Sequence, residues 1–229
     1  MINVIEPNWP APSNIKAYTT LRSIALDYLP PSRQLLQSIL DLPSEPFWLQ
    51  QAHTNIALPA QPDNRDQTAD ATFTDQAQHI CLIFTADCLP ILLCNQAGTH
   101  VAAIHAGWRG LANGIIGNTL DALGLKGPDL LAWLGPGISQ PCYEVGEEVY
   151  ELFIKADANN ASAFVPSPNQ RWLADLYALA RLQLKKRDVQ AIYGGHYCTF
   201  SDAKHFFSYR REGKKGRMAT LIWMDNGKP

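Results

Sequence analysis

The chain has 229 residues, of which 46% are hydrophobic and 17% are charged. This composition supplies a sizeable core and excludes a globally disordered protein. The 19 Lys and Arg residues against 21 Asp and Glu residues give a formal charge of -2 at pH 7. Such a balance excludes a strong electrostatic attraction to nucleic acid or to an anionic membrane.

No apolar stretch is long enough to span a bilayer, and residues 1–10 lack the basic and apolar regions of a signal peptide. The 5 cysteines are an odd number and do not form a dense framework, which favours reduced thiols. We therefore expect a cytoplasmic protein, either a monomer or a weak homo-oligomer, with small molecules rather than nucleic acid or membrane as partners.

The predicted elements begin with a helix over Ser32–Leu42, a strand over Phe47–Ile56 and a polar loop over residues 59–69. The next β-prone runs are His79–Thr85, Pro90–Cys94, Val101–Ile104 and Leu130–Leu134. The turn residues Asn95–Gly98 between two of these runs predict a hairpin. Apolar residues at helical spacing predict helices over Trp108–Leu123, Val145–Ile154 and Trp172–Lys186. The chain closes with predicted strands over Val189–Tyr193, Phe206–Tyr209 and Met218–Trp223.

Strands and helices interleave in this pattern without the strict alternation of a doubly wound parallel sheet. The pattern therefore favours a mixed α/β fold, and we expect it to form one domain over residues 1–229.

Three segments place a soft ligand at the edge of a predicted strand: His53, Cys88 and His105. Side chains at strand ends project into clefts while the sheet fixes their backbone. Two imidazoles and one thiolate suit Zn²⁺, and three protein ligands leave a fourth position open, as in catalytic zinc sites. The pattern thus permits a catalytic metal site.

Two other interpretations of the same residues remain open. A histidine at a strand end is often a hydrogen-bonded structural residue, and a lone cysteine is often a small hydrophobic one. Alternatively, Cys88 is a nucleophilic thiolate with His105 as its base and Asp87 or another acid as the orienting group.

Arg109 follows Gly107 where a helix is expected to begin, and a helix N-terminus beside a guanidinium favours anion binding. It is otherwise an exposed first-turn residue or the partner of a carboxylate such as Asp87. Near the C-terminus, Phe206–Arg211 combines aromatic rings with two arginines, a set that can hold a planar base. More often such a segment is a core strand with a charged end.

Several motifs occur in a fixed order along the chain. They are Thr-Ala-Asp-Cys-Leu-Pro at residues 85–90, His-Ala-Gly-Trp-Arg-Gly at 105–110, Gly135-Pro136 with Tyr143–Gly146, and Phe207–Arg211 with Gly216–Met218. Together they resemble the laccase-domain family over nearly the whole chain, from Asn8 to Trp223. That family was first labelled multicopper polyphenol oxidase. It was later assigned as zinc-dependent purine nucleoside phosphorylases with adenosine deaminase activity, and bacterial members are also called peptidoglycan editing factor.

The resemblance implies Zn²⁺ held by His53, Cys88 and His105, and catalytic roles for Cys88, His105, Asp87 and Arg109. Arg109 would help to hold phosphate, and Asp87 would support a ligand or transfer a proton. The implied fold is a layered sandwich with a mixed central sheet flanked by helices. The implied substrates are phosphate and purine nucleosides of the adenosine, inosine and methylthioadenosine class. Deamination of adenosine would use zinc-activated water.

The sequence departs from the family pattern in two places. Gln51-Ala52-His53-Thr54 stands where members usually have Gln-Val-His-Gly. Thr19–Ser23 runs almost directly into a predicted helix, where members have a Gly-Gly-Val-Ser stretch and a loop. A shortened loop at this point affects the expected closure of the pocket and the expected range of substrates.

Other functions fit parts of the sequence. A copper-dependent polyphenol oxidase is one alternative, although a single three-ligand site matches a multicopper cluster poorly. An amidase or hydrolase of peptidoglycan precursors, with Cys88 as nucleophile, is a second. A metal-binding interaction module without turnover is the non-enzymatic alternative.

Overall fold

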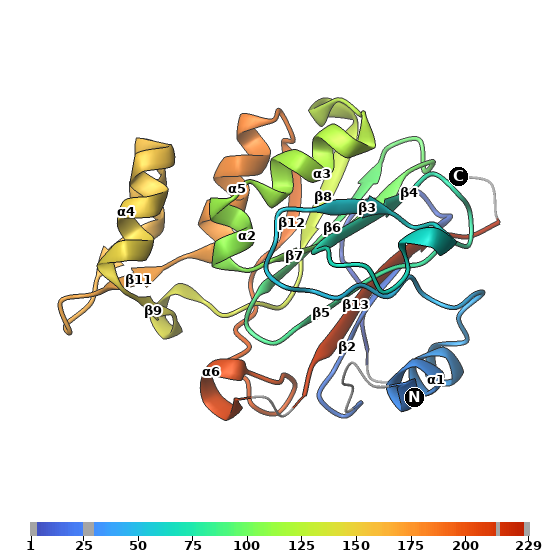
Figure 1. The fold of residues 1–229 in the computed structure, drawn as a ribbon, viewed down its shortest axis with the longest axis horizontal. Helices are drawn as coiled ribbons and strands as arrows, with labels where there is room; N and C mark the ends of the chain where they lie inside the picture. The colour runs from blue at the N-terminus through green and yellow to red at the C-terminus, as the bar shows by residue number, and fades with distance from the viewer. Residues whose placement is uncertain (1–3, 25–29, 214–215, 227–229) are drawn as a thin grey trace.

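The computed structural model describes residues 4–24, 30–213 and 216–226, and Figure 1 shows two sheets packed in layers with helices. The larger sheet has the order β12-β8-β6-β7-β4-β3. Its strands are β3 Ala57–Pro59, β4 Ala71–Thr74, β6 Leu89–Asn95, β7 Val101–Ala106, β8 Leu130–Leu134 and β12 Ala191–Gly194. This sheet is mixed, because β12 runs parallel to β8 and β3 runs parallel to β4, while the central pairs are antiparallel.

The smaller sheets are antiparallel. One has the order β1-β2-β13-β5, formed by β1 Val4–Ile5, β2 Ile15–Thr20, β5 Cys81–Thr85 and β13 Met218–Met224. The other has the order β10-β11-β9, formed by β9 Glu144–Val145, β10 Phe164–Pro166 and β11 Trp172–Ala174. It stands with α4 at one side of the molecule (Figure 1).

Helices cover the outer faces of the layers. The α-helices are α1 Pro30–Leu40, α2 Trp108–Ala112, α3 Ile115–Leu123, α4 Glu147–Ala156, α5 Leu176–Lys186 and α6 Tyr209–Glu212. Short 3-10 helices cover Pro62–Asn64, Gly127–Asp129, Gln140–Cys142 and Ala158–Ala163. In Figure 1, α2, α3 and α5 lie over the larger sheet, and β2, β5 and β13 lie on its other side. No helix in the described part of the chain combines the length and apolar character needed to cross a membrane.

The side chains of the central strands point alternately to the two faces of the larger sheet, so each face packs against a different layer. In β6, Ile91 and Leu93 pack toward the helices, whereas Leu92 and Cys94 pack toward the smaller sheet. Successive side chains of a strand point to opposite faces, so a strand buried on both faces is apolar at every position. The same alternation along β7 makes His105, near its end, point toward the space between the sheets.

The predicted fold class is confirmed as a mixed α/β fold of layered sheets with flanking helices. The predicted hairpin is also present, since β6 and β7 pair antiparallel with Pro90 opposite His105. Strand β2 and strand β4 were not expected from the sequence. The predicted shortening of the loop after Ser23 falls largely on residues 25–29, which lie outside the described residues.

The strand predicted over Phe47–Ile56 is wrong. This segment makes only isolated bridges, from Phe47 to Cys81 and from Gln50 to Thr68. At residues 51–54, hydrogen bonds that involve side chains take the place of a regular strand pairing. The Gln51 amide bonds the backbone of Phe84 at 2.7 and 2.8 Å, and a carboxylate described below accepts three successive N–H groups.

Three further elements were predicted incorrectly, because glycine and capping residues interrupt the pattern. The helix predicted over Trp108–Leu123 breaks at Gly114, whose φ of 83° is left-handed. The helix predicted from Trp172 begins only after Asp175, which caps α5 by accepting from the Ala178 N–H at 2.9 Å. The strand predicted over Phe206–Tyr209 is a loop that ends at Ser208, the N-cap of α6.

The break at Gly114 gives a test of stability. Replacing Gly114 with Ala meets no neighbouring atom within 4 Å, so the left-handed backbone alone should lower the free energy of unfolding by about 1 kcal/mol. The matched change Gly117→Ala, within α3, should raise it by about 0.5 kcal/mol because alanine favours a helical backbone. Urea unfolding of both variants measures the difference, and equal effects would contradict the assignment of the break.

Candidate metal centre

Three predicted ligand side chains meet at one end of the larger sheet. His105 lies near the end of β7, Cys88 directly precedes β6, and His53 comes from the irregular segment before β3. Their potential ligand atoms all lie within 4.8 Å of one another. The rings of His53 and His105 meet edge to face with centroids 4.8 Å apart. Among the described residues, this is the one group of three metal-ligating side chains that converges in this way.

The geometry of the group fits a tetrahedral ion. The Cys88 sulfur lies 3.6 Å from Nε2 of His53. Zinc bonds of about 2.3 Å to sulfur and about 2.0–2.1 Å to nitrogen, at a tetrahedral angle, would place two such atoms about 3.6 Å apart. Cys88 is only partly exposed and His105 is 4% exposed. A set of two nitrogens and one sulfur also matches the donor chemistry that zinc prefers.

Asp70, which was not predicted from the sequence, positions two of these ligands. Its carboxylate is fully buried and lies 2.6 Å from Nδ1 of His105. The same carboxylate accepts from the N–H groups of Ala52, His53 and Thr54 at 3.2, 3.0 and 2.6 Å. With Nδ1 of His105 occupied as a donor, Nε2 is the ring nitrogen left for a ligand role.

Charge stabilises this arrangement. Burial alone would raise the pKa of Asp70, but hydrogen bonds from His105 and Thr54 and the charge of His105 outweigh it and lower the pKa to about 2. Burial would likewise raise the pKa of Cys88, yet the neighbouring imidazoles of His105 and His53 lower it. Both shifts favour the charged forms, carboxylate and thiolate. A thiolate is the form of cysteine that binds metal.

Gly107 keeps the space between two ligands open. A Cβ at this position would lie 2.8 Å from the Cδ2 ring carbon of His53 and 2.9 Å from the Cys88 sulfur. Both distances are shorter than side chains tolerate, so the His-Ala-Gly-Trp motif needs glycine here for close approach rather than for an unusual backbone angle.

Asp87, which directly precedes Cys88, is hydrogen-bonded to the C-terminal segment. Its carboxylate, 7% exposed, accepts from the hydroxyls of Thr199 and Ser208 at 2.6 and 3.0 Å and from the Arg210 N–H at 2.7 Å. Asp87 also has a left-handed φ of 85°. These three donors fix the turn that presents Cys88.

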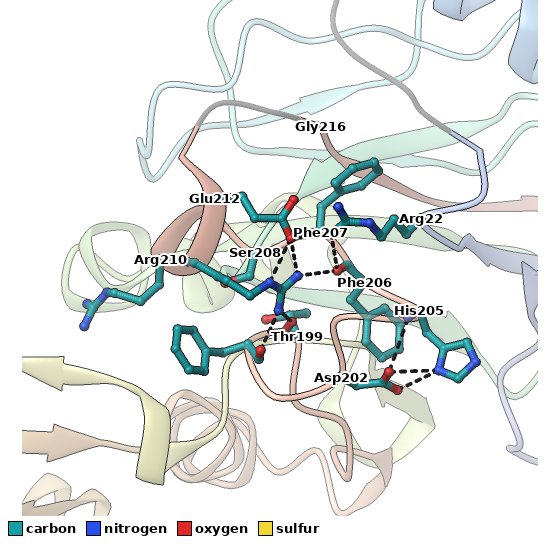
Figure 2. A network of polar contacts seen from close by, with 12 residues as sticks. Arg22, Thr199, Asp202, His205, Phe206, Phe207, Ser208, Arg210, Glu212 and Gly216 are labelled. Carbon is teal, nitrogen blue, oxygen red and sulfur yellow. Dashed lines mark hydrogen bonds and ion pairs between the residues drawn. The ribbon is translucent and has the colours of Figure 1, made fainter.

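Arg211 also holds the C-terminal segment in place. Its guanidinium donates to the carbonyl groups of Thr199, Phe200 and Phe206 and pairs with Glu212, which also contacts Arg22 (Figure 2). Several backbone carbonyls without strand partners are satisfied by one side chain. The loop over residues 199–206 is therefore fixed although it belongs to no sheet.

Two arginines and two aromatic rings flank the group of ligands. The exposed Arg109 lies over the Trp108 ring at 4.4 Å, and Arg210 lies over the Tyr143 ring at 5.2 Å. The Tyr143 phenol is close enough to Cys88 and to both arginines for their charges to act on it, although burial, the largest effect, raises its pKa. Predicted residues Arg109, Asp87, Cys88 and His105 thus lie in one region, and Tyr143 and Arg210 join them.

Comparison with known proteins identifies similar chains. Residues 30–225 match the family model described as multi-copper polyphenol oxidoreductase laccase. Purine nucleoside phosphorylase PA4543 of Pseudomonas aeruginosa is 43% identical over 97% of this chain and 98% of its own. Purine nucleoside phosphorylase YfiH of Escherichia coli is 39% identical over 98% of this chain and 100% of its own. The crystal structure of Neisseria meningitidis protein NMB0706 is 40% identical and superposes with a TM-score of 0.92, covering 98% and 100% of the two chains.

The role of Asp70 can be tested by removing its charge with little change in shape. Asp70→Asn should lower the affinity for added Zn²⁺ by about 10- to 100-fold, because the Asn amide cannot hold His105 and the residues 52–54 as the carboxylate does. Asp75→Asn, at the exposed end of β4, is the matched control and should leave the affinity unchanged. Competition with a chromophoric chelator measures both, and wild-type affinity in Asp70→Asn would contradict this role.

Proposed function

Since the chain belongs to the family described as multi-copper polyphenol oxidoreductase laccase, we propose that it is a zinc-dependent purine nucleoside phosphorylase that also deaminates adenosine. The observation that carries this proposal is end-to-end similarity, at 43% and 39% identity, to relatives named purine nucleoside phosphorylase. The convergence of His53, Cys88 and His105 supports the metal dependence. Five free thiols and small polar substrates agree with a cytoplasmic location.

His53, Cys88 and His105 would hold the ion from one side and leave another side for a reactant. Bound zinc would supply a Lewis acid that polarises a phosphate or substrate oxygen and lowers the pKa of water. Asp70 keeps the His105 ring oriented through its Nδ1 contact at 2.6 Å. Asp87 acts in this proposal by positioning the turn before Cys88, because its carboxylate is engaged by three donors.

The flanking arginines and aromatic rings fit the two substrates. A phosphate dianion is recognised well by guanidinium groups, and Arg109 presents one at the exposed edge of the site. A purine base can stack on an aromatic ring, and Trp108 and Tyr143 each contact one of the arginines. We place phosphate near Arg109 and the base near these rings.

The alternative chemistries have less support. Multicopper oxidation needs several copper sites, whereas the described residues bring together one group of three ligands. A Cys88 nucleophile has one observation in its favour, the lowered pKa of a thiol beside two imidazoles. Thiol chemistry of that kind would not require a metal ion, so chelation separates it from the proposed reaction.

The principal test is an assay of nucleoside turnover. Zinc-loaded protein with inosine and phosphate should form hypoxanthine and ribose 1-phosphate. With adenosine it should form adenine and ribose 1-phosphate when phosphate is present, and inosine and ammonia by reaction with water. Chelator treatment should abolish both activities and added Zn²⁺ should restore them. Cys88→Ser should lower turnover by more than about 100-fold, since loss of a ligand should exceed the about 10- to 100-fold effect of a residue that only supports one.

The outcomes separate the alternatives. Hydrolysis of peptidoglycan precursors that survives chelation and is abolished by alkylation would favour the thiol hydrolase. Activity on phenols only after copper loading would favour the polyphenol oxidase. Zinc binding at one equivalent with no nucleoside turnover would overturn the proposed function.

Arg109 provides a separate test of phosphate recognition. Arg109→Gln should raise KM for phosphate about tenfold or more, because a hydrogen bond to a charged group contributes roughly 1.5–3 kcal/mol. Zinc content and KM for the nucleoside should change little. Lys155→Gln, an exposed cation on α4, is the control and should leave the phosphate KM unchanged. An unchanged phosphate KM in Arg109→Gln would exclude Arg109 from the phosphate site.

A further inference from the structure

One buried hydroxyl ties together two loops at the end of the larger sheet. Tyr177 lies in the first turn of α5 and is 7% exposed. Its oxygen accepts from the Gly137 N–H at 2.7 Å, and its hydroxyl donates to the Gly135 carbonyl at 3.0 Å. The same oxygen lies 3.2 Å from the Tyr197 carbonyl oxygen. Tyr177 therefore contacts both the loop that follows β8 and the loop that follows β12.

The same two loops hold Asp87, which directly precedes Cys88. In the first loop, the Ile138 N–H donates to the Asp87 carbonyl at 2.9 Å. In the second loop, the Thr199 hydroxyl donates to the Asp87 carboxylate at 2.6 Å. The loops are also joined to each other, because the Thr199 N–H donates to the Gly137 carbonyl at 3.0 Å. The main chain and the side chain of Asp87 are thus both bonded to segments that the buried hydroxyl holds.

The backbone conformation of Asp87 requires this support. Its φ of 85° is left-handed, which is unfavourable for a residue with a side chain. The first loop packs closely against it, since a Cβ added at Gly137 would lie 3.4 Å from the Asp87 carbonyl oxygen and 3.3 Å from the Cα of Leu89. A displaced loop would let this turn relax toward a more favourable backbone angle. The Cys88 sulfur, 3.6 Å from Nε2 of His53, would then move with the turn.

We infer that Tyr177 is a positioning residue for the candidate ligand Cys88, although it lies outside the group of ligands. Its hydroxyl holds the loops after β8 and β12, these loops hold the left-handed Asp87, and Asp87 determines where the Cys88 sulfur lies. Without the hydroxyl, the buried Gly137 N–H would lose its partner, and the loop would have to rearrange to satisfy it. The inference rests on metal binding, which is part of the proposed function, and not on nucleoside turnover.

The test compares wild-type protein with Tyr177→Phe, which removes one oxygen and keeps the ring. Both are loaded with Co²⁺, because cobalt bound by a thiolate gives a near-ultraviolet charge-transfer band that reports on the cobalt–sulfur bond. In Tyr177→Phe this band should shift or lose intensity. Competition with a chromophoric chelator should show an affinity for Zn²⁺ lowered by about tenfold, the lower end of the effect expected from a group that supports a ligand.

Thr19→Val is the matched control for a general loss of stability. It removes a buried hydroxyl that contacts the Thr220 hydroxyl at 2.9 Å, between β2 and β13. The variant should unfold at a lower urea concentration than wild-type protein but keep the wild-type cobalt band and the wild-type affinity for Zn²⁺. A loss of affinity in Thr19→Val equal to that in Tyr177→Phe would overturn the inference, because both losses would then follow from stability alone.

Thr199→Val tests the connection through Asp87, because it removes the hydroxyl bond to the carboxylate and keeps the Thr199 N–H. It should also change the cobalt band. The double variant with Tyr177→Phe should lose less affinity than the two separate losses combined, since both act on the same turn.

An unchanged band and affinity in either single variant would overturn the inference, and Thr199→Val decides the matter where Tyr177→Phe folds poorly. Wild-type protein that binds neither Co²⁺ nor Zn²⁺ would overturn the proposed metal dependence and this inference together. Normal binding by both wild-type protein and Tyr177→Phe would overturn this inference alone.

Discussion

The contact between the Asp70 carboxylate and its five donors is the constraint on which the candidate site depends. It accepts from Nδ1 of His105, from three successive N–H groups at residues 52–54 and from the Thr54 hydroxyl. Two potential ligands, His105 on a regular strand and His53 in an irregular segment, are thereby both hydrogen-bonded to one buried carboxylate. A buried carboxylate without these donors would be strongly destabilising, so the segment cannot move away freely.

The site also contains unusual backbone conformations. His53 and Asp87 have left-handed φ values of 60° and 85°, which cost residues with a side chain roughly 1–3 kcal/mol each. Each is held by carboxylate hydrogen bonds, His53 by the Asp70 side chain and Asp87 by its own contacts to Thr199, Ser208 and Arg210. These strained conformations lower the stability of the folded protein, and they orient the potential ligands before any reactant binds.

Sequence reasoning succeeded where local pattern and long-range structure agree. The β6–β7 hairpin was predictable because both strands are apolar at nearly every position and a turn lies between them. Residues 47–56 were also predicted as a strand, but the N–H groups of residues 52–54 bind the Asp70 carboxylate, and the Gln51 side chain binds the backbone of Phe84. A carboxylate between Ala69 and Ala71, in a small-residue run, was the available signal for a buried acid; its partners at positions 52–54 and 105 are fixed only by the tertiary fold.

The surroundings of the cysteines explain how one reduced chain can carry distinct thiol chemistries. Cys81 and Cys94 are buried between the two sheets, where burial raises the pKa of each to about 12 and leaves an inert thiol. The pKa of Cys88 is lowered by the neighbouring imidazoles, whereas the pKa of Cys198 is lowered by hydrogen bonds from serines. Asp87 connects the segments that carry the last two, because it directly precedes Cys88 and its carboxylate accepts from the hydroxyl of Thr199, next to Cys198. A cysteine of this chain is thus an inert core residue or a candidate metal ligand according to the groups that stabilise or exclude its charge.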